Sequence, residues 1–316
     1  MLKIGTFTFA EFFKQMRNQR GMSQVDLAAG IIHRSLISKI ENGHYIPEYG
    51  RLALLVERLG FGMDNIGKNH HDDMQEIEGC INRNDFDNAE KRIAQLEKND
   101  DFMDSIYNQQ AVFLFKALLM MKNNDQQESV RKAILDGLAI TIRNFDEKKL
   151  ADYILTANDI KLINQLAILY WKHKETDAAI QLMHGLIQNL ESNCTDVRYR
   201  ARMLPWLYFN LINYLYEEKR YNEEIPLLDK GIEYCIKSSS LYFLPHLIGN
   251  KAWCKYRLGD TTEGFKYFRR AYHMYDGYDL REPRSIVHRF VLENYNVDLS
   301  LLNEISIQLA YMGGGK

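Results

Sequence analysis

Apolar residues recur at helical spacing along almost the whole chain, and glycines divide its first part into short segments. Gly21, Gly30 and Gly43 each follow an amphipathic stretch, at a place where a helix is expected to end. Polar residues that can cap a helix stand at the starts of these stretches. The pattern predicts four short helices within about the first 60 residues.

Two of these helices begin with a capping box, in which a side-chain oxygen and a carboxylate satisfy the open amides of the first turn. Thr8 with Glu11 fits the first helix, and Ser23 with Asp26 fits the second. A third helix is predicted over residues 35–42, and a fourth follows Pro47. The fourth helix is expected to turn four apolar side chains inward, namely Leu52, Leu55, Val56 and Leu59.

The helical pattern weakens after these four helices and then resumes for the rest of the chain. Residues 63–73 contain few apolar positions and include a polar run at 68–73, so they are predicted to be a linker. Residues 74–312 show helical periodicity, few prolines and no alternating strand pattern. The predicted fold class is all-α, with a helix-turn-helix domain over residues 1–62 and a second helical domain after the linker.

The second domain repeats itself. Five segments share a turn followed by a small or polar residue at the start of an amphipathic helix, and their last residues are 40, 50, 45 and 40 positions apart. These segments are residues 84–89, 124–129, 174–179, 219–224 and 259–264. This is typical of a stretched tetratricopeptide-like α-solenoid, whose usual period is about 34 residues.

Composition and charge limit the possible functions. No run approaches the roughly 18 apolar residues of a membrane span, and no secretory signal is evident, so a cytoplasmic location is expected. The four cysteines lie far apart, which argues against a zinc site or a disulfide framework. No catalytic or cofactor motif is present, so neither enzyme activity nor a cofactor is predicted. Residues 1–70 hold nine Lys/Arg and six Asp/Glu, a net charge of +3, so this end is suited to face phosphate.

The predicted third helix has the side chains of a DNA-reading helix. Ile37 and Ile40 lie three positions apart and are expected to face the core. The outward side then carries short polar or cationic residues, which are Arg34, Ser35, Ser38 and Lys39. Such side chains can reach base edges when a helix enters the major groove of double-stranded DNA. The alternative is a four-helix packing module that never touches DNA.

The capped pattern over residues 17–60 resembles the helix-turn-helix of the phage-repressor (XRE/Cro) type, which has a lambda-repressor-like fold. The resemblance implies that Gln24 and Asn42 hold phosphates, and that Arg34, Ser35 and Lys39 meet bases. It also implies a structural ion pair between the residues that correspond to Arg17 and Glu41.

Three asparagines are equally placed in the repeats. Asn164, Asn210 and Asn250 stand 14 residues before Ala178, Glu224 and Gly264, and Asn213 lies on nearly the same helix face as Asn210. A carboxamide both donates and accepts hydrogen bonds, so such a row can hold a peptide backbone. Arg202, in a basic cluster before Pro205, is a candidate anchor for a carboxylate. Alternatively, these side chains are merely exposed, and the nearby aromatic residues form the core between repeats.

The order of a helix-turn-helix, a short linker and helical repeats in about 300 residues resembles the RNPP family of Gram-positive regulators. The resemblance implies a homodimer that binds a two-fold DNA operator, a short signalling peptide bound by the repeats, and quorum sensing as the biological role. Two alternatives remain open: a phage-type lysogeny or communication regulator of the same architecture, and a repeat scaffold that holds a protein partner.

Overall fold

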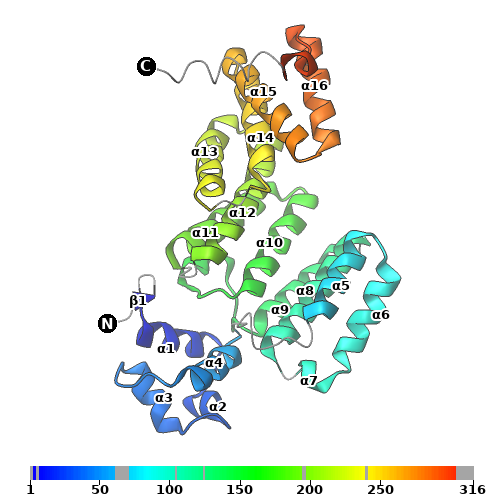
Figure 1. Cartoon of the computed structure of the whole chain (residues 1–316). Coiled ribbons are helices and arrows are strands. Elements are labelled where there is room, and N and C mark those ends of the chain that lie inside the picture. Colours follow the sequence, from blue (N-terminus) through cyan, green and yellow to red (C-terminus); the bar gives the residue numbers. More distant parts are fainter. Residues whose placement is uncertain are drawn as a thin grey trace. The chain divides into compact units, whose positions relative to one another are not determined.

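The computed structural model describes residues 3–4, 7–60, 71–103, 105–123, 125–193, 197–238 and 241–303. It is helical except for a short antiparallel hairpin, β1 (Lys3–Ile4) with β2 (Phe7–Thr8), so the predicted all-α class is confirmed (Figure 1). The chain divides into two compact units, Met1–Asp196 (unit 1) and Val197–Lys316 (unit 2). Among the described helices, none combines the length and apolar character needed to span a membrane.

The four predicted N-terminal helices are α1 (Phe9–Gln19), α2 (Gln24–Ala28), α3 (Arg34–Glu41) and α4 (Tyr49–Arg58). Helix α3 begins one residue earlier than predicted, because His33 rather than Arg34 provides its N-cap, and Asn42 is its C-cap. Of the four residues predicted to face inward from the fourth helix, Leu55 and Leu59 are fully buried and Leu52 and Val56 are half-buried. The core of this domain is formed by Phe13, Met16, Leu27, Ala28, Ile37, Ile40, Leu55 and Leu59.

Three helical hairpins follow in unit 1. They pair α5 (His71–Asn82) with α6 (Phe86–Glu97), α8 (Ile106–Lys122) with α9 (Gln127–Ala139), and α10 (Ala157–Lys172) with α11 (Thr176–Asn193). The short helix α7 (Asp100–Met103) and the 3-10 helix η1 (Glu147–Asp152) lie between hairpins and lengthen the repeat spacing. Helix α5 begins at His71, within the stretch predicted as a linker, and residues 63–70 of that stretch lie outside the described residues.

Unit 2 continues the same pattern. Helix α12 (Val197–Glu217) pairs with α13 (Tyr221–Ser238), and α14 (Leu244–Arg257) pairs with α15 (Thr261–Gly277). Helix α16 (Arg281–Tyr295) packs against α15 and is followed by the 3-10 helix η2 (Leu299–Asn303). The five predicted repeat segments thus correspond to the turns of five hairpins.

These turns share one backbone geometry. A residue with positive φ ends the first helix in four of them, with φ of 58° at Asn84, 65° at Lys174, 58° at Lys219 and 85° at Gly259. The next amide then donates to a carbonyl near the end of that helix, for example from Asp85 to Cys80 at 2.9 Å. This is the Schellman arrangement, which satisfies the last carbonyls of a helix and starts the return helix.

The position five residues after each positive-φ residue packs against the first helix of the hairpin and usually carries a small side chain. Ala89, Ala179 and Gly264 are buried there. At Gly264 an added Cβ would lie 3.2 Å from the Tyr256 amide nitrogen, so there is almost no space for a side chain. Glu224 occupies the same position in the α12–α13 hairpin and is also fully buried, which places a carboxyl group inside unit 2.

Candidate DNA-binding helix and repeat surface

The turn between α1 and α2 is fixed by Gly21 and by the predicted capping box of α2. Gly21 has φ of +64°, a left-handed conformation that favours glycine. The Ser23 hydroxyl accepts from the Asp26 amide at 3.1 Å, and the Asp26 carboxylate accepts from the Ser23 amide at 2.9 Å. Hydrogen bonding with the Ser23 side chain and then with its amide lowers the pKa of Asp26. The cap therefore sets the direction in which α2 leaves α1.

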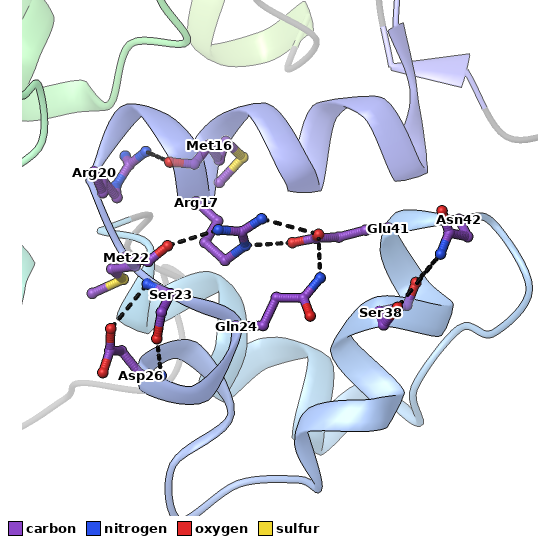
Figure 2. A network of polar contacts seen from close by, with 10 residues as sticks. All are labelled: Met16, Arg17, Arg20, Met22, Ser23, Gln24, Asp26, Ser38, Glu41 and Asn42. Carbon is purple, nitrogen blue, oxygen red and sulfur yellow. Dashed lines mark hydrogen bonds and ion pairs between the residues drawn. The ribbon is translucent and has the colours of Figure 1, made fainter.

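A buried ion pair joins α1 to the end of α3 (Figure 2). The Arg17 guanidinium donates to both Glu41 carboxylate oxygens, at 2.5 and 3.1 Å, and the two side chains are only 11% and 3% exposed. Arg17 also donates to the Met22 carbonyl at 2.7 Å, and the Gln24 amide donates to Glu41 at 2.9 Å. The predicted structural pair is confirmed, and it fixes α3 relative to α1 and α2. Because Gln24 already bonds Glu41, any phosphate contact from its amide nitrogen has to share or replace that bond.

The outward face of α3 has the composition that the sequence predicts. Ile37 and Ile40 are fully buried, whereas Arg34, Ser35 and Lys39 are exposed. Ser38 is half-buried, and Asn42 is exposed and donates to the Ser38 carbonyl at 2.8 Å. The helix therefore presents two cationic and several polar side chains on one side while its apolar side anchors it to the domain.

The helix-turn-helix domain is attached to the repeats within unit 1. The Gln19 side chain donates to the Ile154 carbonyl at 3.0 Å and accepts from the Ile154 amide at 2.9 Å, as a neighbouring strand would. The Ile154 side chain is buried in the core of the helix-turn-helix domain. Beside this contact, burial lowers the pKa of Arg20 to about 10, and the negative charge of Asp159 opposes the shift.

Three of the predicted peptide-binding asparagines lie in unit 2. Asn210 and Asn213 on α12 and Asn250 on α14 are all half-buried. The Asn250 side chain donates to the Asn213 side chain at 3.0 Å, so carboxamides from successive first helices meet directly. Arg202, also on α12, is exposed, and its guanidinium lies 5.5 Å from the centre of the Tyr199 ring.

Asn164 is placed differently. It lies on α10 in unit 1 and is fully buried, because α10 packs against α8, α9 and α11. A bound molecule could touch it only if surrounding side chains moved. The aromatic residues near the asparagines favour the core interpretation: Tyr208 and Tyr214 are buried, and Trp253 packs on Phe290 with ring centres 4.3 Å apart.

Two candidate functional residues, His33 and Glu224, were not predicted from the sequence. His33 lies two positions before Ser35, where the third helix was expected to begin, and its role as the N-cap was not predicted. Glu224 appeared only as the last residue of a repeat segment, and its occurrence where the other repeats carry alanine, serine or glycine is the signal that could have identified it. Burial raises its pKa to about 8, and the Cys254 thiol opposes this rise only in part.

Comparisons with known proteins agree with this architecture. Residues 13–66 match the family model described as helix-turn-helix, and residues 138–294 match the model of the RNPP family C-terminal domain. Comparison with curated protein sequences gives no match.

Solved structures of PlcR share the fold. PlcR of Bacillus thuringiensis in complex with the peptide PapR7 and DNA is 16% identical, with a TM-score of 0.55 over 88% of this chain and 98% of that chain. The apo form of PlcR is also 16% identical, with a TM-score of 0.55 over 94% and 99%. The SHP pheromone receptor Rgg2 of Streptococcus dysgalactiae is 14% identical, with a TM-score of 0.49 over 90% and 99%.

Proposed function

This chain belongs to the RNPP family, and we propose that it is a sequence-specific DNA-binding transcription regulator whose DNA binding is controlled by a short peptide held by its repeats. The proposed DNA binding rests on the geometry of α3. Its buried ion pair and apolar side fix the helix, and its opposite side exposes Arg34, Ser35 and Lys39. A rigid helix with short polar and cationic side chains at its start is what readout in the major groove requires.

The proposed division of labour on DNA follows the positions of the side chains. Arg34, Ser35 and Lys39 read base edges from the exposed face of α3. Gln24 and Asn42, at the start of α2 and just after α3, hold phosphates and set the register. Ser38 is half-buried and bonded to Asn42, so its contribution is to position that residue.

A single domain of this size gives a small DNA interface, about 600–1,000 Å². We propose that two copies of the chain form a homodimer and bind a two-fold operator whose half-sites lie about 34–36 Å apart, one DNA turn. Such a dimer gains affinity only when both reading helices match the half-site spacing. Any change in the relative placement of the two copies then changes DNA affinity.

The peptide part rests on α12 and α14. Asn210, Asn213 and Asn250 supply donors and acceptors that suit a peptide backbone, and Arg202 supplies a cation for a terminal carboxylate. The similar PlcR structure is a complex with the peptide PapR7 and DNA, so a peptide is the first ligand to test. The peptide shifts DNA binding only if it binds two conformations of the protein unequally.

The proposal is tested with the full chain and a library of random duplexes. Repeated selection yields the preferred duplex, and its Kd is compared with that of a scrambled duplex at the same salt concentration. The measurement is repeated with synthetic peptides that correspond to short reading frames beside the gene. A Kd ratio near one would refute sequence-specific binding, and an unchanged ratio with every peptide would refute peptide control.

A further inference from the structure

His33 stands at the tip of α3, on the side proposed to meet DNA. It is exposed and has extended backbone angles, φ −73° and ψ 141°, as an N-cap residue should. Its ring nitrogen Nδ1 accepts from the Ser35 amide at 3.3 Å and lies 2.8 Å from the Ser35 hydroxyl oxygen. One imidazole nitrogen thus contacts both polar groups of a residue expected to read bases.

The contact with the Ser35 amide favours the tautomer in which Nδ1 is unprotonated. Nδ1 can accept from the Ser35 amide only if it carries no proton, so the proton of the neutral ring is on Nε2. At 2.8 Å from an unprotonated Nδ1, the Ser35 hydroxyl has to be the donor. His33 therefore offers one hydrogen-bond donor, Nε2–H, and Ser35 Oγ is left with lone pairs alone.

We infer that His33 contacts DNA through Nε2–H and that the same ring restricts Ser35 to accepting hydrogen bonds. The inference rests on the proposed function of α3 and adds His33 to the residues proposed to contact DNA. Acceptors for Nε2–H are a purine N7, a guanine O6, a thymine O4 or a phosphate oxygen. The donors that suit Ser35 are the exocyclic amines of adenine and cytosine. The first turn of α3 should thus prefer an adenine or cytosine opposite Ser35.

The His33→Ser substitution removes the imidazole ring but keeps a side chain that can cap α3. Serine is a good N-cap residue, so the His33→Ser chain keeps the start of α3, and its thermal unfolding midpoint should equal that of the parent. The shorter side chain cannot reach DNA at the former position of Nε2, and the Ser35 hydroxyl becomes able to donate. The matched control is His173→Ser, at an exposed histidine that ends α10 far along the chain from α3.

The experiment uses the full chain and the random duplex library. The selected duplex should bind His33→Ser about three- to tenfold more weakly than the parent, as expected for the loss of one neutral hydrogen bond, while His173→Ser binds as the parent does. If Nε2–H meets a base, a new selection with His33→Ser will lose the preference at one or two positions. If it meets a phosphate, affinity will fall equally for all sequences.

Two results would overturn the inference, and they can be told apart. If the parent enriches no sequence, the proposed function fails and this inference fails with it. If the parent enriches a sequence that His33→Ser binds with the same Kd and the same base preferences, only the role of His33 is refuted.

Discussion

Glu224→Gln tests whether the carboxyl group buried in unit 2 makes folding depend on pH. Glu224 is fully buried where the other repeats carry alanine, serine or glycine, and its pKa is lowered only by the Cys254 thiol. Burial raises its pKa from 4.5 to about 8. In the folded protein the group is therefore protonated at neutral pH, whereas in the unfolded chain it is ionised.

The sign and size of the effect follow from this difference. Between the two pKa values the folded state binds more protons than the unfolded state, so the free energy of unfolding falls as pH rises. Since one pKa unit corresponds to about 1.4 kcal/mol, the loss between pH 5 and pH 7 is about 2–3 kcal/mol. Glutamine has nearly the same shape and does not ionise, so the Glu224→Gln protein should lose this part of the slope and exceed the parent in stability at pH 7.

Urea unfolding at pH 5, 6 and 7 measures the effect. Tryptophan fluorescence in a Trp171→Phe background reports on unit 2, because Trp206 and Trp253 both lie there. Burial lowers the pKa of His246, and this contribution makes the free energy of unfolding rise with pH. Because it is present in both proteins, the effect of Glu224 is measured as the difference in pH dependence between the variant and the parent. The control is Glu223→Gln, an exposed neighbour paired with Arg220. Equal slopes for all three proteins would refute the reasoning.

Three further predictions concern the proposed sites. Lys39→Ala should weaken binding to the selected duplex by about 1–3 kcal/mol at matched salt and relax the base preference at one position, which competition with single-base variants will reveal. Glu41→Gln leaves the Arg17 charge buried without its partner, which should destabilise the helix-turn-helix domain by about 3–5 kcal/mol. Thermal unfolding followed by circular dichroism measures this loss. An unchanged melting curve would mean that the ion pair is dispensable. Asn210→Ala should lower the affinity for a peptide that changes DNA binding, as measured by calorimetry, and leave the DNA affinity without peptide unchanged. An unchanged peptide affinity would mean that the peptide binds elsewhere.

The local pattern was sufficient for most of the N-terminal domain. Caps, glycine stops and the spacing of Ile37 and Ile40 depend on residues a few positions apart, so the sequence alone identifies the helices and the outward side of α3. The ion pair between Arg17 and Glu41 spans 24 positions, and it was predicted only through the family resemblance.

Contacts between distant segments were not predictable in the same way. The pairing of Gln19 with Ile154 joins positions 135 apart, and no local pattern marks either residue. Asn164 lies 15 positions before Ala179, whereas Asn210 and Asn250 lie 14 positions before Glu224 and Gly264, so Asn164 is one residue out of register with them. It is buried among the helices packed around α10. A repeat pattern fixes the position of a residue within its hairpin, but burial also depends on the neighbouring hairpins.

The central claim is that the exposed face of α3 reads a DNA sequence. The most direct measurement is the ratio of Kd values for the selected and the scrambled duplex, at the same salt concentration, for the parent chain and for a chain carrying Arg34→Ala and Lys39→Ala together. The account predicts a ratio of at least about 1,000 for the parent, as specific regulators show, and a ratio near one for the double variant. A parent ratio near one, or an equally large ratio in the double variant, would contradict it.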